Sequence, residues 1–222
     1  VLKRGAAVGF AHGVAVRFGT WEFPPDSDVF LVAPAGPGVD LRERFVAGHG
    51  IPAVIAVERD ASGQARERAL AYAKAILYWQ YRNGFCSACG SANRIESAGH
   101  RLVCSNPDCG RESFPRIDPS VIVLVTHGDA CLLGRNARWP ERRFSALAGY
   151  VEPGESLEDA VVREVFEESR VRLSSIEYVS SQPWPFPAST MCGFYATAED
   201  RRCEPTEEMV EVRWFTAGSL AQ

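Results

Sequence analysis

Three glutamates in the second half of the chain have the spacing of a metal-binding face. Glu164, Glu167 and Glu168 stand at positions i, i+3 and i+4, so a helix over this stretch places them on one side. Like charges at this spacing repel each other and cost stability unless something positive offsets them. Carboxylate oxygens are the ligands that hard divalent cations prefer. The spacing therefore predicts a cation site, and the alternative is a solvated acidic helix.

The residues around these glutamates predict a loop followed by a helix. Pro153-Gly154 is a turn signal, and Ser156 is a candidate N-cap with Asp159 three residues later. Apolar residues then recur with helical spacing and predict a buried stripe of Leu157, Ala160, Val161 and Val165. Arg163 lies among the acidic residues, and we expect it to pair with a glutamate and hold it in place.

Four of the seven cysteines predict a zinc site. They form two pairs, with two residues inside the first, four inside the second and fourteen between the pairs: Cys86, Cys89, Cys104 and Cys109. Gly90 and Gly110 follow the pairs and permit tight turns. Four thiolates leave no open position for water, so we expect the zinc to be structural. Two disulfides are the alternative, which the lack of a secretory signal disfavours.

Composition excludes several classes of protein. The chain has 222 residues, 46% hydrophobic and 23% charged, which is typical of one or two globular domains. Its net charge of −4 gives no reason to expect strong nucleic-acid affinity from bulk electrostatics. No apolar run has the length of a membrane span, and no signal peptide is evident. We expect a cytoplasmic or another reducing intracellular location, although targeting signals beyond either end would not be visible.

Hydrophobic patterns predict an α+β chain with a mixed sheet flanked by helices. Strands are expected at 14–18, 29–32, 51–57, 121–125, 130–133, 176–179, 192–196 and 210–215. Residues 64–83 read as one amphipathic helix whose apolar stripe is Ala69, Leu70, Ala73, Ile76, Leu77 and Tyr81. We therefore expect a β-rich N-terminal domain over 1–83, a zinc ribbon over 84–114 and a third domain over 115–222.

The glutamate segment resembles the Nudix box. The box places a glycine, a glutamate and then an Arg-Glu-apolar-x-Glu-Glu run at fixed spacing, which here falls on Gly149, Glu155, Arg163, Glu164, Val165, Glu167 and Glu168. The glycine that usually follows is replaced by Arg170. A helix often ends on a residue with positive φ, so arginine there should cost about 1 kcal/mol in strain.

A second motif, SQPWPFPAS at 181–189, has three prolines among Trp184 and Phe186. The prolines fix the backbone, which suits either aromatics held at the rim of a site or a rigid turn with its aromatics packed inward. The run resembles the SQPWPFPxS signature of the NADH pyrophosphatase family of Nudix hydrolases. The cysteine ribbon and the FPRIDPSVIVLV run at 114–125 match that family too.

The resemblance implies a Nudix α/β/α sandwich with a mixed sheet, preceded by a zinc ribbon and a small β-rich domain. It implies cleavage of the pyrophosphate of NAD(H) to nicotinamide mononucleotide and AMP, and in some members removal of NAD caps from RNA. Mg²⁺ or Mn²⁺ would be held by the carboxylates of Glu164, Glu167, Glu168 and Glu208, with Glu168 as general base or water-orienting ligand and Arg163 orienting its neighbours.

The resemblance also implies a homodimer and a dinucleotide pocket. Phe114 and Tyr150 would sandwich the nicotinamide ring, one of them from the partner subunit. The rest of the pocket would be lined by Gln182, Pro183, Trp184, Pro185, Phe186, Pro187, Ala188 and Ser189.

Two other functions stay open on the sequence alone. Arg94, His100, Arg101, Arg111 and Arg116 give the cysteine region a basic character, which suits a nucleic-acid-binding module as well as a solvated face. A Nudix relative that binds nucleotides without cleaving them is the other, although the complete glutamate set argues against it.

Overall fold

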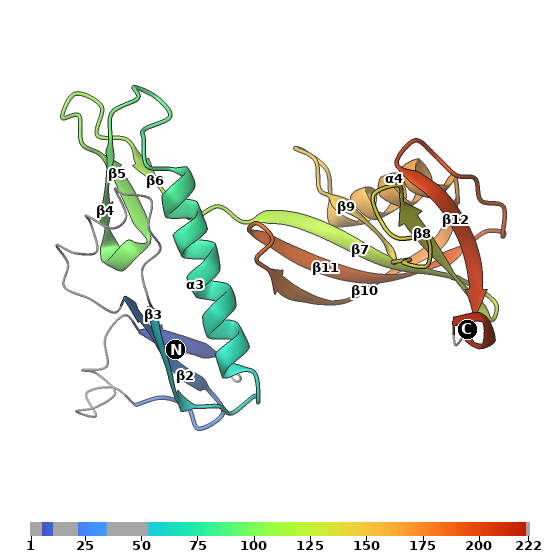
Figure 1. Ribbon diagram of the computed structural model, residues 1–222, viewed down its shortest axis with the longest axis horizontal. Coiled ribbons are helices and arrows are strands. Elements are labelled where there is room, and N and C mark those ends of the chain that lie inside the picture. Colours follow the sequence, from blue (N-terminus) through green and yellow to red (C-terminus); the bar gives the residue numbers. More distant parts are fainter. Residues whose placement is uncertain (1–5, 11–21, 35–52, 221–222) are drawn as a thin grey trace. The chain divides into compact units, whose positions relative to one another are not determined.

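The computed structural model describes residues 6–10, 22–34 and 53–220. Its contacts divide the chain into two compact units, Val1–Arg116 and Ile117–Gln222, and each is described by itself (Figure 1). Within the described residues, no helix is both long enough and apolar enough to cross a membrane.

The first unit begins with a three-stranded sheet in the order β1-β2-β3. Strand β2 (Asp28–Pro34) pairs in parallel with β1 (Ala7–Phe10) and antiparallel with β3 (Ala53–Arg59). The strands predicted at 29–32 and 51–57 therefore fall on β2 and β3, although 51 and 52 lie outside the described residues. The strand predicted at 14–18 lies wholly outside them.

Helix α3 (Ala65–Arg82) confirms the helix expected over 64–83, but its apolar stripe was predicted only in part, since Ala69 is buried and Ala73 and Ile76 are half-buried. The buried face carries Ala65, Ala69 and Trp79, whereas Leu70, Leu77 and Tyr81 of the predicted stripe are exposed. A long-range ion pair fixes this face, because Arg68 Nη1 on the helix lies 2.9 Å from Oδ2 of the buried Asp28 on β2. Helical periodicity carries no information about such a contact.

The cysteine region forms a small antiparallel sheet after α3. Its strands are β4 (Asn93–Glu96), β5 (Arg101–Cys104) and β6 (Glu112–Ser113), with a single 3₁₀ turn, η1 (Ser97–Gly99), between β4 and β5. The side chain of Gln80 on α3 donates a 2.8 Å hydrogen bond to the carbonyl of Gly99. The ribbon is thus tied directly to the helix that precedes it.

The second unit is built on a mixed six-stranded sheet in the order β10-β11-β7-β8-β12, with β9 pairing with β7. Strand β7 runs parallel to β11 and antiparallel to β8 and β9. The bounds are β7 (Asp118–His127), β8 (Ala130–Asn136), β9 (Leu147–Tyr150), β10 (Leu173–Trp184), β11 (Ser189–Ala198) and β12 (Met209–Thr216). Helix α4 (Leu157–Ser169) packs against this sheet, and the short α5 (Ala217–Leu220) follows β12.

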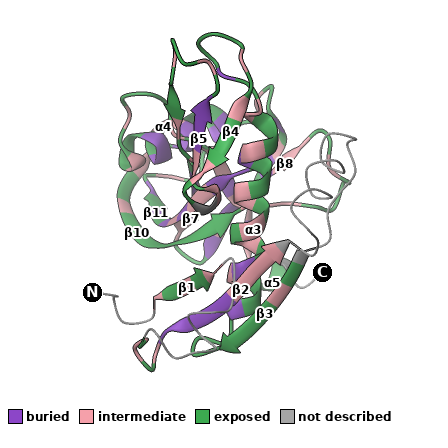
Figure 2. Cartoon of the chain, turned by 90° about the vertical axis from the view of Figure 1, so that its left-hand side faces the viewer, coloured by how far each residue is buried: buried purple, intermediate pink, exposed green. Residues whose placement is uncertain are grey.

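The core of this unit lies between α4 and one face of the sheet (Figure 2). Val121, Val123 and Val125 alternate along β7 and are fully buried, as a strand with one covered face requires. Val161 and Val165 meet them from α4 and are also fully buried. The predicted stripe of α4 is therefore confirmed, and the buried side of the helix also carries Glu164 and Glu168.

Two strands differ from the sequence expectations. Strand β9 is not among the strands predicted from the sequence. Strand β10 was expected at 176–179 but continues through Gln182, Pro183 and Trp184. Proline is tolerated there because β10 is an edge strand and pairs only with β11.

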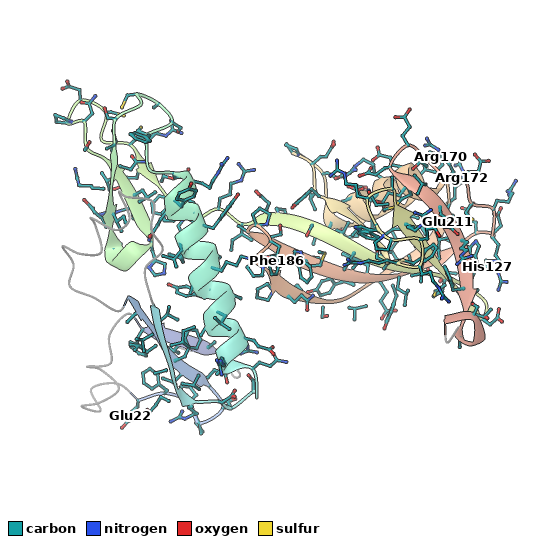
Figure 3. All side chains as sticks on the ribbon, in the orientation of Figure 1. Glu22, His127, Arg170, Arg172, Phe186 and Glu211 are labelled. Carbon is teal, nitrogen blue, oxygen red and sulfur yellow. The ribbon has the colours of Figure 1, made fainter. Side chains whose placement is uncertain are left out.

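Helix α4 ends on Arg170, which has the left-handed conformation usually occupied by glycine (φ 63°). Its guanidinium lies 5.4 Å from the ring centre of Phe166, and that of Arg172 lies 5.7 Å from the same ring. Both arginines reach the end of the helix together (Figure 3). The cation–π contact and the negative end of the helix dipole offset part of the backbone strain at this position.

We predict that Arg170→Gly changes stability little whereas Arg170→Ala destabilises. Glycine relieves about 1 kcal/mol of left-handed strain but loses a cation–π contact of similar size. Alanine keeps the strain and loses the contact, so it should cost about 1 kcal/mol in the free energy of unfolding measured with urea. Equal stability of the two variants would contradict this explanation of the helix end.

Candidate functional site

The helix that carries the glutamates begins at a side-chain cap. Ser156 Oγ accepts a 3.1 Å hydrogen bond from the backbone N–H of Asp159, and it donates to Oδ2 of Asp159 at 2.7 Å. This confirms the predicted N-cap. Glu158 and Asp159 lie in the first turn, where the helix dipole favours negative charge.

Arg163 connects the loop, the helix and the end of β9. Its Nε and Nη2 donate to both oxygens of Glu155 at 2.7 and 2.9 Å, and its Nη1 donates to Glu164 and Glu167 at 2.9 and 3.0 Å. Nη2 also donates to the backbone carbonyl of Tyr150 at 2.9 Å. Hydrogen bonds from Arg163 lower the pKa of Glu155 to about 2. The predicted pairing is thus present, and the guanidinium is fully engaged within the protein.

Strand β9 approaches the glutamate face of α4 so closely that only glycine fits at one position. A Cβ added to Gly149 would lie 1.8 Å from the carboxyl carbon of Glu164. One residue earlier, the backbone N–H of Ala148 donates to Glu168 Oε2 at 3.2 Å. Along β9, therefore, Ala148 meets Glu168, Gly149 meets Glu164 and Tyr150 meets Arg163.

Glu168 is the most buried of the four candidate ligands, with 2% of its surface exposed. Burial, followed by repulsion from Glu164, raises its pKa to about 8. Burial also raises the pKa of Glu164. Repulsion from Glu208, just before β12, raises the pKa of both carboxyls further. A group of carboxyls with raised pKa values is an environment that a cation would stabilise.

The donor set fits a hard divalent cation, because every candidate ligand is a carboxylate oxygen. Glu167 is 55% exposed and stands at the rim of this group. Among the described residues, only the cysteines bring three or more ligand atoms within 4.8 Å of one another. The carboxylates thus lie on α4 and just before β12, and their oxygens would have to move closer together to bind one ion.

The four predicted zinc ligands do lie together. Their sulfur atoms are all within 4.8 Å of one another, and all seven cysteines are free, which disfavours the two-disulfide alternative. Gly90 and Gly110 have positive φ angles of 75° and 54°, as the predicted tight turns require. Hydrogen bonds from Ser91 lower the pKa of Cys89 to about 6, so one ligand is already poised as a thiolate.

The SQPWPFPAS run forms the end of β10, a turn and the start of β11. Phe186 lies at this turn (Figure 3). Trp184 and Phe186 contact each other edge to face at 5.6 Å and are 42% and 61% exposed, so the alternative of inward-packed aromatics is wrong for them. Ala188 and Ser189 are buried, and Ser189 Oγ lies 3.4 Å from the hydroxyl of Tyr150. The motif is thereby brought to Tyr150, the residue that precedes the loop leading into α4.

Phe114 and Tyr150 are 62% and 52% exposed. They belong to different units of the chain, so their joint role stays a prediction. One residue was missed from the sequence: Asn136 donates its side-chain N–H to the carbonyl of Glu208 at 3.3 Å. A lone asparagine at the end of a strand gives no signal that it will position a residue 72 places away.

We predict that Glu168→Gln stabilises the protein when divalent cations are removed. A free glutamate titrates near 4.5 and Glu168 in the fold at about 8, so rising pH destabilises the folded state between these values. By pH 7 the loss is about 3 kcal/mol, at about 1.36 kcal/mol per pKa unit. Urea unfolding in EDTA at pH 5 and pH 7 should show this loss in the wild type and not in Glu168→Gln.

The exposed Glu177→Gln variant serves as the control, because it removes one carboxylate from the same unit without touching the site. The explanation fails if Glu177→Gln behaves like Glu168→Gln, or if the wild type keeps its full stability between pH 5 and pH 7.

The chain is similar to curated proteins that are named NAD-capped RNA hydrolases. The NAD-capped RNA hydrolase NUDT12 of Macaca fascicularis is 39% identical over 214 residues, covering 88% of this chain and 45% of the relative. The NAD-capped RNA hydrolase NudC of Pseudomonas aeruginosa (strain LESB58) is 45% identical over 152 residues, covering 68% of this chain and 54% of the relative. The chain thus spans about half the length of these curated relatives.

A solved structure agrees with the fold. The crystal structure of a NUDIX hydrolase from Nitrosomonas europaea superposes with a TM-score of 0.50 at 26% identity, covering 61% of this chain and 78% of that one. Residues 1–80 match the model of the acetohydroxy acid isomeroreductase NADPH-binding domain, which accounts for about a third of the chain.

Two further matches account for more than half of the chain and fall on both sets of candidate ligands. Residues 82–114 match the model of the NADH pyrophosphatase zinc ribbon domain, and residues 116–222 match that of the NUDIX domain. The first covers the four clustered cysteines, and the second covers the glutamate helix and β9. The chain therefore belongs to the Nudix family and carries the zinc ribbon domain of the NADH pyrophosphatases.

Proposed function

We propose that the protein hydrolyses the pyrophosphate bond of NAD(H) to nicotinamide mononucleotide and AMP, and that it removes NAD caps from RNA. The observation that carries this proposal is the buried pair Glu164 and Glu168, pressed against β9. The relatives are named NAD-capped RNA hydrolases, which supports the substrate class.

The four glutamates supply the ligands and the base for this reaction. Mg²⁺ or Mn²⁺ held by Glu164, Glu167, Glu168 and Glu208 would neutralise the charge on the diphosphate and lower the pKa of the attacking water. Glu168, whose carboxylate lies among these ligands, would orient that water or take its proton.

Arg163 acts as a positioning residue. Its hydrogen bonds to Glu155, Glu164, Glu167 and the carbonyl of Tyr150 commit its guanidinium to the protein. By these contacts it holds the box loop (residues 151–156) and the end of β9 in place beside the proposed metal ligands on α4.

The substrate pocket proposed here runs from Tyr150 to the SQPWPFPAS turn. The contact between Tyr150 and Ser189 supports it, because it joins the two motifs within one unit. The nicotinamide ring would stack on Tyr150, with Phe114 on the other side and one of the two supplied by the partner subunit of a homodimer. Exposed aromatic faces at Trp184 and Phe186 offer further stacking surfaces.

The cysteine cluster is proposed to hold a structural Zn²⁺ in a reducing compartment. Four sulfur ligands leave no position at which water could bind the ion. The ion would fix the knuckle turns of a ribbon that has only three short strands of its own.

The RNA-binding module, the main alternative, is disfavoured by the charges of the ribbon. Arg94 and Arg101 both pair with Glu96, and Arg101 pairs with Glu112 as well. Four thiolates around one Zn²⁺ would add further negative charge. The basic character that the sequence suggests is therefore largely neutralised within the ribbon itself, which leaves little attraction for phosphates.

We predict that Glu168→Gln lowers NADH hydrolysis in Mg²⁺ or Mn²⁺ at least about a hundredfold, as expected for the loss of a ligand or general base. Glu158→Gln, an exposed change on the same helix, should stay within about threefold of the wild type since it touches no candidate ligand. Products are identified by chromatography as the two mononucleotides. Undiminished turnover in Glu168→Gln would refute the assignment.

We predict that the purified chain holds one Zn²⁺ and that Cys104→Ser loses it. Because the cluster organises the ribbon, residues 84–114 should then become sensitive to protease and the melting temperature should fall. Cys203→Ser, outside the cluster, should keep its zinc. A Cys104→Ser protein with an unchanged protease pattern would show that the ribbon does not depend on the metal.

A further inference from the structure

An arginine-rich loop stands out on the Nudix unit. Residues 137–143 lie in the loop that joins β8 to β9 and carry the exposed side chains of Arg138, Arg142 and Arg143, with Glu141 as the one acidic residue among them. The unit as a whole is acidic, because Asp and Glu outnumber Arg 17 to 10 over residues 117–222 and lysine is absent there. The loop is thus a positive region on a domain that otherwise repels polyanions.

Both ends of the loop are fixed by hydrogen bonds within the Nudix unit. At its start, Asn136 donates to the carbonyl of Glu208 at 3.3 Å and accepts from the N–H of Arg138 at 3.0 Å. At its end, the backbones of Gly134 and Ser145 exchange hydrogen bonds of 2.9 and 3.0 Å. The loop that carries the arginines therefore starts beside the backbone of Glu208, a proposed metal ligand, and is not a free tether.

Strand β9 indicates the direction in which a bound dinucleotide would run. Its first residue, Leu147, follows the loop, and its last, Tyr150, is the proposed stacking partner of the nicotinamide ring. The two ends are about 10 Å apart at about 3.3 Å per residue. The carboxylates Glu168 and Glu164 meet the strand between these ends. A dinucleotide with its nicotinamide at Tyr150 and its diphosphate at the carboxylates would direct its adenosine toward the loop.

The loop has the surface chemistry of a single-stranded RNA contact. The guanidinium of Arg143 lies 5.3 Å from the ring centre of Trp139, and both groups stand on the same turn. No ion pair engages Arg138 or Arg143 within the described part of the chain. Arginines that neutralise phosphates, next to an aromatic ring on which a base can stack, are the usual means of holding RNA without reading its sequence.

We propose that residues 137–143 bind the RNA chain that follows the NAD cap, through its first phosphates and one stacked base. This inference rests on the proposed function, since it assigns the path of the RNA from the same active site. The loop then raises the efficiency of the enzyme on NAD-capped RNA and contributes nothing to hydrolysis of free NADH.

The test compares two charge-matched double variants. Arg138→Gln with Arg143→Gln removes two charges from the loop, and Arg172→Gln with Arg202→Gln removes two from the ends of α4 and β11. Each is assayed on free NADH and on an NAD-capped single-stranded RNA of ten nucleotides. For the loop variant we expect kcat/KM on capped RNA to fall about tenfold and its salt dependence to weaken, with NADH hydrolysis unchanged. The control should retain both activities.

Three results would overturn the inference: equal loss on both substrates in the loop variant, no loss on either, or an equal loss on RNA in the control. Binding of the same RNA without a cap, measured by fluorescence anisotropy, separates this inference from the proposed function. If the wild type hydrolyses neither substrate but the loop variant alone loses RNA binding, the proposed activity fails and the RNA surface stands. If wild-type binding is unaffected by the loop changes, the surface is wrong whatever the activity.

Discussion

The guanidinium of Arg163 is the interaction on which the arrangement of the site depends. It joins the box loop through Glu155, the helix through Glu164 and Glu167, and the last residue of β9 through the carbonyl of Tyr150. A carboxylate face on α4 could otherwise turn toward water and separate its charges. Because Arg163 draws the end of β9 onto this face, Gly149 comes against Glu164 and the N–H of Ala148 reaches Glu168. Sequence separation is small throughout, so the site is largely assembled within one segment.

At Glu168 the same arrangement lowers stability in order to serve function. Glu168 is almost fully buried among like charges, which raises its pKa to about 8 and makes the metal-free site unfavourable at neutral pH. Burial of the valines of β7 and α4 stabilises the fold and offsets this cost. A buried carboxylate without a cation is a weakness in the fold, and the same carboxylate is a strong ligand once a cation is present.

Local patterns were sufficient for much of the site. The spacing of Glu164, Glu167 and Glu168, the cap at Ser156 and the pairing of Arg163 follow from helical geometry, and the cysteine cluster follows from ligand spacing. Features set by distant partners could not be predicted. The buried face of α3 depends on Asp28, forty residues before Arg68, and the anchoring of the arginine loop depends on Asn136 meeting Glu208. Strand β9 could not be predicted because its four residues are too few to show a strand pattern. It is defined by its antiparallel pairing with β7.

Direct measurement of Mn²⁺ binding tests the central claim that the buried carboxylates form a cation site. Electron paramagnetic resonance of free Mn²⁺, titrated with the protein at neutral pH, reports binding without any substrate. The account predicts that the wild type binds Mn²⁺ and releases protons as it does so, and that Glu168→Gln weakens binding at least about tenfold while Glu158→Gln leaves it unchanged. Equal binding by the wild type and Glu168→Gln, or no binding by the wild type, would contradict it.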